Sequence, residues 1–174
     1  MGEKPLNIHE DLFKAIYDDS PIGIELYDSK GKLIDVNQSC MELFGVSSKD
    51  HVKGFDLMND PNIPKEYLTK LKHRETVKFE SIFDFDLVKK KKLYKTSKSG
   101  KIYLDVLITP IFLGKKKAIS NYLVQVQDIS SKKIAEVKLI DLNDELESRI
   151  LKKAEELKKF KKISDNANYG IGII

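Results

Sequence analysis

The sequence is poor in the residues that make disulfide bonds and metal sites. It has one cysteine, Cys40, three histidines and no tryptophan among 174 residues. A lone cysteine forms no internal disulfide bond, which excludes a disulfide-stapled secreted protein and fits a reducing cytosol. So few thiols and imidazoles also exclude a structural zinc module. We therefore expect no metal site and a cytoplasmic location.

Long apolar runs are missing as well. No stretch approaches the roughly 20 apolar residues that span a bilayer, and no hydrophobic signal segment follows Met1. The chain is nevertheless 41% hydrophobic and 33% charged, which is enough apolar material to bury a core. The sequence therefore predicts a folded domain without membrane insertion.

Positive charge is not concentrated where nucleic-acid binding needs it. The net charge is +4, and the stretch from Ser131 to Ile163 holds ten lysine or arginine residues and seven acidic residues. Mixed charge on one helix favours solubility, whereas nucleic-acid-binding domains gather basic and aromatic residues on their folded part. We therefore expect no nucleic-acid partner.

The apolar pattern divides the chain into four segments. Residues 1–19 are predicted to form an N-terminal helix, because Asn7 and Glu10 make a capping box before apolar residues at helical spacing. Residues 20–130 form the main domain, and residues 131–163 form a lysine-rich, coiled-coil-like linker helix.

The fourth segment, residues 164–174, continues a repeat of the beginning of the chain. The matching pairs are Phe13–Asp18 with Phe160–Asp165, and Gly23-Ile24 with Gly170-Ile171. We interpret this segment as the truncated start of a second repeat. We expect Asn166–Ile174 to be poorly ordered or docked irregularly.

Alternating apolar and polar residues predict strands within the main domain. They are expected at residues 22–27, 32–36, 76–88, 101–112 and 120–128, with helices at 38–44 and 65–74. The first of these helices lies between a capping Asn37 and a terminating Gly45. Each long strand has one apolar and one largely polar face; in the fourth, Leu104 and Val106 alternate with Asp105. The predicted fold class is α+β, an antiparallel sheet covered by short helices on one face.

Several segments of the domain resemble those of PAS domains in their order and spacing. They are Gly31–Asn37, Cys40–Ser47, Val52–Gly54, Ser99–Val106, Thr109-Pro110 and Gln127–Ser130, and the resemblance covers about residues 10–130. It implies a five-stranded antiparallel sheet with helices over one face, enclosing a small pocket. It also implies a role as a sensor or relay in signal transduction, often in the sensor histidine kinases of two-component systems. The chain departs from the family pattern at Lys89–Lys92, which lengthen the hairpin after the third strand.

The resemblance also bears on cofactors. Flavin-binding light sensors of the family need a reactive cysteine on the pocket helix, where this chain has Leu57–Pro61 without one. Cys40 lies on another helix and is interpreted as a small, buried, inert residue. Heme-binding members place a histidine on the helix before the third strand, which makes His73 the candidate heme ligand. A single histidine between Lys72 and Arg74 is more often a solvated residue favoured by the helix dipole, so we expect neither flavin nor heme.

The residues do not form a recognisable catalytic constellation. Cys40 and the nearest histidine, His51, have no third orienting group, and Asp84 and Asp86 are interpreted as the solvated side of a strand. A glycine-rich phosphate loop and metal-ligand spacing are lacking as well. We predict that this chain is not itself an enzyme and that its parent protein is a candidate histidine kinase.

The candidate ligand pocket lies between the helix at 65–74 and the sheet. Its predicted lining residues are Tyr67, Leu71, Phe79, Ser81, Leu104, Val106, Tyr122 and Val124. Such walls suit a small, mostly apolar or aromatic molecule with one or two hydrogen-bonding groups. The alternative is that these residues simply fill the core, because small domains seldom keep an empty space.

Asp128, Ile129 and Ser130 are the candidate signal relay, because they join the last strand to the linker helix and resemble the family's junction triplet. Ser130 is also a candidate helix cap.

The apolar stripe of the linker helix consists of Leu139, Leu142, Leu146, Ile150, Ala154 and Leu157. So narrow a stripe is stable only when it is paired, which predicts a parallel homodimer through this helix. The alternative is a lone connector that packs on its own domain.

Two functions stay open at this point. The first is a cytosolic sensory module that binds a small molecule, or relays a conformational signal through its C-terminal helix, to control a downstream signalling domain in the same chain. The second is a ligand-free dimerisation or spacer module in a tandem array. Constitutive occupancy of the pocket separates the two.

Overall fold

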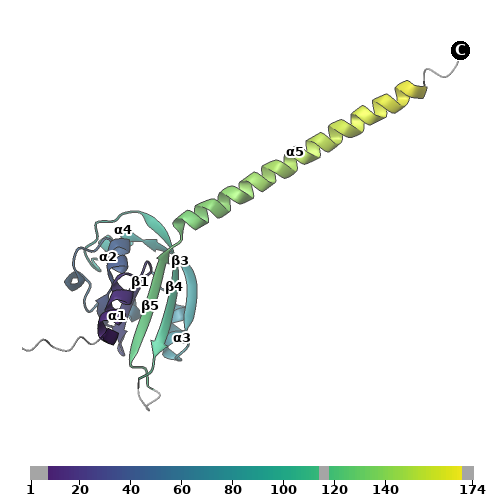
Figure 1. Ribbon diagram of the computed structural model, residues 1–174. Helices are drawn as coiled ribbons and strands as arrows, with labels where there is room; N and C mark the ends of the chain where they lie inside the picture. The colour runs from purple at the N-terminus through teal and green to yellow at the C-terminus, as the bar shows by residue number, and fades with distance from the viewer. Residues whose placement is uncertain (1–7, 114–117, 170–174) are drawn as a thin grey trace, which may run out of the picture. The chain divides into compact units, whose positions relative to one another are not determined.

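The computed structural model describes residues 8–113 and 118–169. They belong to two compact units, divided between Ser130 and Ser131. The first unit contains α1 (Ile8–Asp18), β1 (Gly23–Asp28), β2 (Leu33–Val36), α2 (Gln38–Phe44), η1 (Lys49–His51), η2 (Leu57–Asn59), α3 (Lys65–Lys72), β3 (Val77–Asp84), α4 (Phe85–Lys90), β4 (Lys101–Ile111) and β5 (Asn121–Asp128) (Figure 1). The second unit is formed by α5 (Ser130–Tyr169), which begins at the last residue of the first.

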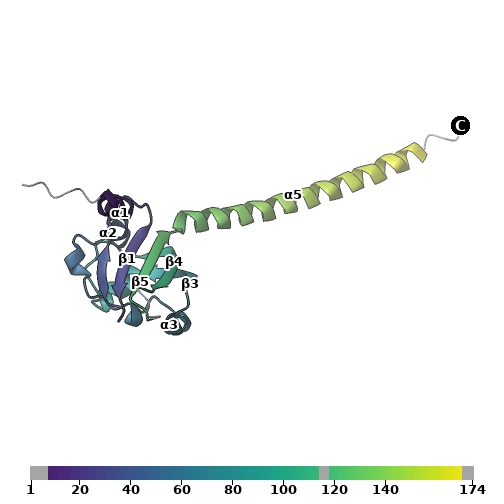
Figure 2. The same ribbon diagram turned by 60° about the horizontal axis from the view of Figure 1, so that its bottom comes forward.

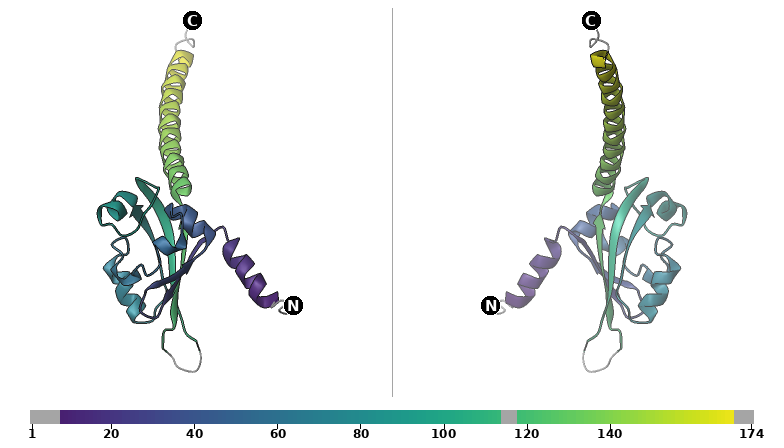
Figure 3. Two further views of the ribbon diagram at one scale, coloured as in Figure 1. Left: turned by 90° about the vertical axis from the view of Figure 1, so that its left-hand side faces the viewer. Right: turned by 90° about the vertical axis from the view of Figure 1, so that its right-hand side faces the viewer.

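The strands of the first unit form a five-stranded sheet in the order β2-β1-β5-β4-β3. Every neighbouring pair is antiparallel. The helix α3 lies on one side of the strands and α1 on the other (Figures 2 and 3). The predictions of an α+β class, a five-stranded antiparallel sheet, a leading helix and a long C-terminal helix are therefore confirmed.

The core lies between the sheet and the helices α2, α3 and α4. Strand parity turns one face of β4 and β5 toward these helices, and its side chains Leu104, Val106, Ile108, Tyr122, Val124 and Val126 are buried. Leu71 of α3 and Val88 of α4 are both 0% exposed and close the core from the helical side. The predicted inner face of these two strands is confirmed.

Asn37 joins three elements of the first unit through one buried amide. Its Oδ1 accepts hydrogen bonds from the backbone N–H groups of Cys40 and Ile24, both at 2.9 Å. Its Nδ2 donates to the carbonyls of Tyr17 at 3.0 Å and Ile22 at 2.9 Å. Because all four bonds are made, a polar side chain with 0% exposure costs the fold little. Asn37 thus caps α2 as predicted and also holds the end of α1 and the start of β1.

The end of α2 also follows its prediction. Gly45 adopts a left-handed conformation with φ of 64°, and its N–H bonds back to the last turn of the helix. A Cβ atom at this position would lie 2.7 Å from the Ser97 hydroxyl and 3.0 Å from the Lys98 backbone nitrogen. Glycine is therefore required here both by the backbone conformation and by the close approach of the loop before β4.

The third strand is shorter than predicted, and a helix that the sequence analysis missed follows it. The Asp84 side chain accepts hydrogen bonds from the N–H groups of Asp86 at 2.9 Å and Leu87 at 3.0 Å, which ends β3 and starts α4. Phe85 and Val88, three residues apart, then face the core together. The prediction of a strand reaching residue 88 was wrong, and Lys89–Lys92 form the end of α4 and its following turn rather than a longer hairpin.

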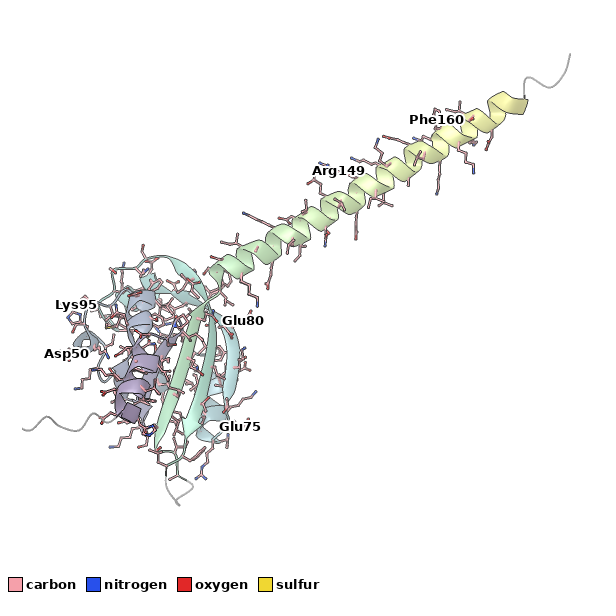
Figure 4. The ribbon with its side chains drawn as sticks, in the orientation of Figure 1. Asp50, Glu75, Glu80, Lys95, Arg149 and Phe160 are labelled. Carbon is pink, nitrogen blue, oxygen red and sulfur yellow. The ribbon has the colours of Figure 1, made fainter. Side chains whose placement is uncertain are left out.

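The helix α5 starts one residue earlier than predicted and extends further. It continues through Tyr169, past the predicted end of the linker helix at Ile163. Residues 170–174 and Asn7, the predicted capping residue of the first helix, lie outside the described residues. Arg149 and Phe160 project from α5 (Figure 4), and Arg149 pairs with Glu145 at 2.6 Å. Within the described part of the chain, α5 included, no helix is both long enough and apolar enough to cross a membrane.

Candidate ligand cavity and output junction

The core of the first unit contains two small neighbouring cavities. The first has a volume of about 50 Å³ and lies near α2, β2 and the segment after α4. The second has a volume of about 40 Å³ and lies over β3, β4 and β5. Both are lined by Glu25, Tyr27, Phe44, Asp60, Asn62 and Phe83. The two cavities are therefore neighbours that share these six residues.

The predicted pocket residues divide between the second cavity and the solid core. Phe79, Ser81, Leu104, Val106 and Val124 line the second cavity. Tyr67 instead stacks on the Phe79 ring, with ring centroids 4.3 Å apart. Leu71 and Tyr122 are buried but are not among the residues that line either cavity. The space that the sequence analysis placed beside α3 thus lies deeper, over the middle of the sheet.

The first cavity and the two acidic residues that line it, Glu25 and Asp60, were not predicted from the sequence. The apolar wall of the first cavity includes Leu33, Val36, Met41, Val46, Val52, Phe55 and Leu93. Glu25 lies at an inward position of β1, between the inward Gly23 and Tyr27. The alternation of inward and outward positions along β1 could therefore have indicated a buried carboxyl group at Glu25.

Glu25 accepts two hydrogen bonds inside the cavity. Tyr27 Oη donates to its Oε2 at 2.5 Å, and Cys40 Sγ donates to its Oε1 at 3.3 Å. Burial outweighs these two bonds and raises the pKa of Glu25 from 4.5 to about 7. Glu25 therefore changes its charge near neutral pH.

Cys40 is buried, as the sequence analysis expected. Burial raises the pKa of its thiol well above the usual value, and the nearby Glu25 carboxylate adds to this. A thiol that resists ionisation is a poor nucleophile and a poor metal ligand. The interpretation of Cys40 as a buried residue is confirmed, although it also donates a hydrogen bond to Glu25.

Asp60 is the second acidic group at the cavity. Its Oδ1 accepts hydrogen bonds from the backbone N–H of Asn62 at 2.9 Å and from Asn62 Nδ2 at 3.0 Å. Burial raises its pKa even so, and the charge of Lys91 opposes that rise only in part. Two carboxyl groups thus line the same cavities, and the charge on Asp60 also raises the pKa of Glu25.

Tyr94 lies at both the first cavity and the protein surface. It lines the first cavity and also a surface depression formed by Lys89, Lys92, Lys95 and His51. Lys95, labelled in Figure 4, is one of the residues that line this depression. Burial raises the pKa of Tyr94, with the charges of Glu25 and Asp60 adding to the rise. Its hydroxyl is therefore a neutral hydrogen-bonding group at the cavity wall.

The cavities accommodate only small guests as they stand. A single buried water needs about 10–15 Å³, so each cavity holds a few waters or a molecule of a few heavy atoms. His73 follows α3 at an exposed position, away from the residues that line both cavities. Among the described residues, no group of three or more His, Cys, Asp or Glu side chains is arranged to hold a metal ion.

The junction before α5 is fastened to β4 by hydrogen bonds. Ile129 N–H donates to the Tyr103 carbonyl at 2.8 Å, and Tyr103 N–H donates to Ser130 Oγ at 3.0 Å. Asp128 Oδ1 accepts from Ser130 N–H at 2.8 Å. The capping oxygen is therefore supplied by Asp128, and the Ser130 hydroxyl binds the neighbouring strand instead of capping the helix. Tyr103 adjoins Leu104, which lines the second cavity.

Known proteins share both the sequence pattern and this fold. The profile of a family described as "PAS domain" matches residues 21–131. A PAS domain from Colwellia psychrerythraea is 20% identical with a TM-score of 0.52, over 72% of this chain and 99% of that one. A PAS domain from a two-component sensor histidine kinase is 8% identical with a TM-score of 0.50, over 70% of this chain and 96% of that one.

A third similar structure is an RNA-binding light-oxygen-voltage receptor. It is 12% identical with a TM-score of 0.60, and the match covers 82% of this chain and 40% of the receptor. At such identities, solved structures indicate the fold alone. No curated protein matches this sequence.

Proposed function

The chain belongs to the PAS domain family of sensory, generally non-catalytic modules, and we propose that it is a cytosolic sensor that binds a small molecule and relays a conformational signal through α5. The observation that carries this proposal is the continuity between the cavity and the junction. Leu104 of β4 lines the cavity, while the preceding residue, Tyr103, holds Ile129 and Ser130. A ligand that displaces the cavity wall would therefore move the anchor of α5.

The effector is proposed to be a downstream signalling domain of the same chain, such as a histidine kinase. One neighbour in fold is a PAS domain of a two-component sensor histidine kinase, which supports this choice by analogy. The match between Phe13–Asp18 and Phe160–Asp165 supports a tandem arrangement in which residues 164–174 begin a second PAS repeat.

We propose that the chain signals as a homodimer, formed through the PAS domain and α5. The stripe residues of α5 are exposed, among them Leu142 at 56% and Leu157 at 68%. On α1, Leu12, Phe13 and Ile16 are also more than half exposed. Apolar side chains of this kind become stable when a second copy covers them.

A ligand-free dimerisation or spacer module is the competing function, and the small volumes favour it. Native mass spectrometry against denaturing mass spectrometry on the freshly purified chain tests the two. A mass excess that is retained in the native spectrum and lost on denaturation supports the sensor and identifies the ligand. A bare dimer, unchanged in mass after incubation with a cell extract, would favour the spacer.

A further inference from the structure

The polar groups at the cavity are unevenly divided between hydrogen-bond acceptors and donors. Glu25 and Asp60 present four carboxylate oxygens, and both oxygens of Glu25 and Oδ1 of Asp60 already accept hydrogen bonds within the domain. The donors of Tyr27, Cys40 and Asn62 are already directed at these carboxyls. A carboxylate oxygen can accept more than one hydrogen bond, so a guest meets oxygens that can accept further donors, and Tyr94 adds a hydroxyl that can serve either way.

The charges at the cavity have one sign. Among the described residues that line the two cavities there is no lysine, arginine or histidine. The lysines of the surface depression do not line the cavities, and neither does Lys91, whose charge offsets only part of the rise in the pKa of Asp60. An anionic guest beside Glu25 and Asp60 would be repelled, whereas a cation would be stabilised by both.

The remaining walls suit the apolar part of such a cation. Phe44, Phe55, Phe83 and Tyr94 line the first cavity, together with aliphatic side chains. The faces of aromatic rings attract cations, most strongly where water is excluded. The wall thus combines aromatic and acidic groups around a space for a few heavy atoms.

We propose that the cavity binds a small organic cation, a protonated amine of a few heavy atoms whose ammonium group lies beside Glu25 and Asp60. This inference rests on the proposed sensory function and names its class of ligand. The bound ammonium donates hydrogen bonds to the carboxyl oxygens, while its carbon atoms contact the aromatic wall. Binding tightens as the pH rises through about 7, because Glu25 then ionises; the groups that face it are Tyr27, Cys40, Asp60 and Tyr94.

Titration of the isotope-labelled chain with ethylammonium chloride tests the proposal. Sodium chloride at equal ionic strength, ethanol and sodium acetate are the salt, neutral and anionic controls. A three-atom ligand at its best binds with a Kd of about 1 mM. We expect saturable NMR shifts at the amides around Glu25 and Asp60 with ethylammonium alone.

Two variants locate the site. Glu25→Gln keeps the shape of the side chain and removes its charge, and is expected to weaken ethylammonium binding at least tenfold. Asp60→Asn is expected to act in the same direction and serves if the first variant does not fold. Glu66→Gln, at an exposed position of α3, is the matched control and should leave binding unchanged.

Three results would each overturn the proposal that the ligand is a cation. The first is binding of ethanol or acetate as tight as that of ethylammonium. The second is equal binding of ethylammonium by Glu25→Gln and Glu66→Gln. The third is the absence of any saturable shift. The proposed sensory function is decided separately, because native mass spectrometry would still detect a neutral or anionic ligand.

Discussion

Large apolar side chains are buried in the core of the first unit but exposed along α5. In the first unit Leu71, Val88 and Ile108 are 0% exposed, whereas in α5 even Leu146, the least exposed of the leucine and isoleucine residues of the stripe, is 52% exposed. Burial of apolar surface supplies most of the free energy of folding. The first unit therefore carries its own stability, whereas burial within the described residues contributes little to the 40-residue α5.

The largest expected effect tests this contrast with one substitution in each region. Phe85→Ala removes a side chain that is 1% exposed and should lower the free energy of unfolding by about 3–5 kcal/mol. Phe160→Ala, at a position 73% exposed, should change it by about 0.5 kcal/mol or less. Urea denaturation followed by tyrosine fluorescence measures both. Comparable losses in the two variants would abolish the contrast.

A second experiment compares buried and exposed carboxyl groups by the pH dependence of the free energy of unfolding. The pKa of Glu25 is raised from 4.5 to about 7 by burial, so its ionisation opposes folding and stability falls as the pH rises through this window. Glu25→Gln should lack this fall and be more stable than the wild type above neutral pH by up to about 3 kcal/mol. Stability curves measured at several pH values test it.

Exposed carboxylates provide the control for that experiment. Glu66→Gln in the first unit and Glu147→Gln in α5 remove charges that water already solvates. Their stability should follow the wild type across the same pH range. Parallel curves for Glu25→Gln and the wild type would mean that the cavity does not hold Glu25 away from water.

The third prediction concerns the covering of α5. Leu142→Asn and Leu146→Asn together place polar groups on the apolar stripe and should weaken dimerisation tenfold or more, about 1.4 kcal/mol. Leu151→Asn, off the stripe but 67% exposed, is the matched control. Sedimentation measures the dimer, and the unfolding midpoint of the first unit should stay constant. Loss of the dimer in the control alone would place the contact on another face.

The smallest effect lies where the two regions join. Asp128→Ala removes the oxygen that accepts from Ser130 N–H and should cost about 1 kcal/mol at the start of α5. Faster amide hydrogen exchange at Ser130, with unchanged exchange in β3, would show it. Gln127→Ala, on the exposed neighbour, should have no such effect. In the parent protein, unaltered signal output in Asp128→Ala would remove Asp128 from the relay.

Local chemistry made much of the fold predictable. The alternation along β4 and β5, the cap at Asn37 and the left-handed Gly45 each depend on neighbours in sequence, so the sequence alone predicted them. The helix α4 was missed because Phe83 and Phe85 also fit the parity of a strand. In the structure, the side chain of Asp84 accepts hydrogen bonds from the N–H groups of Asp86 and Leu87 and so caps the helix.

The cavity was harder to predict than the sheet. Glu25, Asp60 and Tyr94 come from distant parts of the chain, and no local spacing indicates that they meet. The apolar pocket residues were chosen by their strand face, which does not distinguish a side chain that fills the core, such as Tyr122, from one that borders a space, such as Val124. Packing of the whole domain decides that difference.

The hydrogen bonds of Asn37 set a practical limit on how the domain can be excised. A fragment trimmed to residues 21–131, the extent of the family match, would lack the Tyr17 carbonyl. One amide hydrogen of a fully buried side chain would then lose its acceptor, at a cost of about 1–3 kcal/mol. The smallest piece that folds with its native stability therefore begins within α1, well before the boundary that sequence similarity suggests.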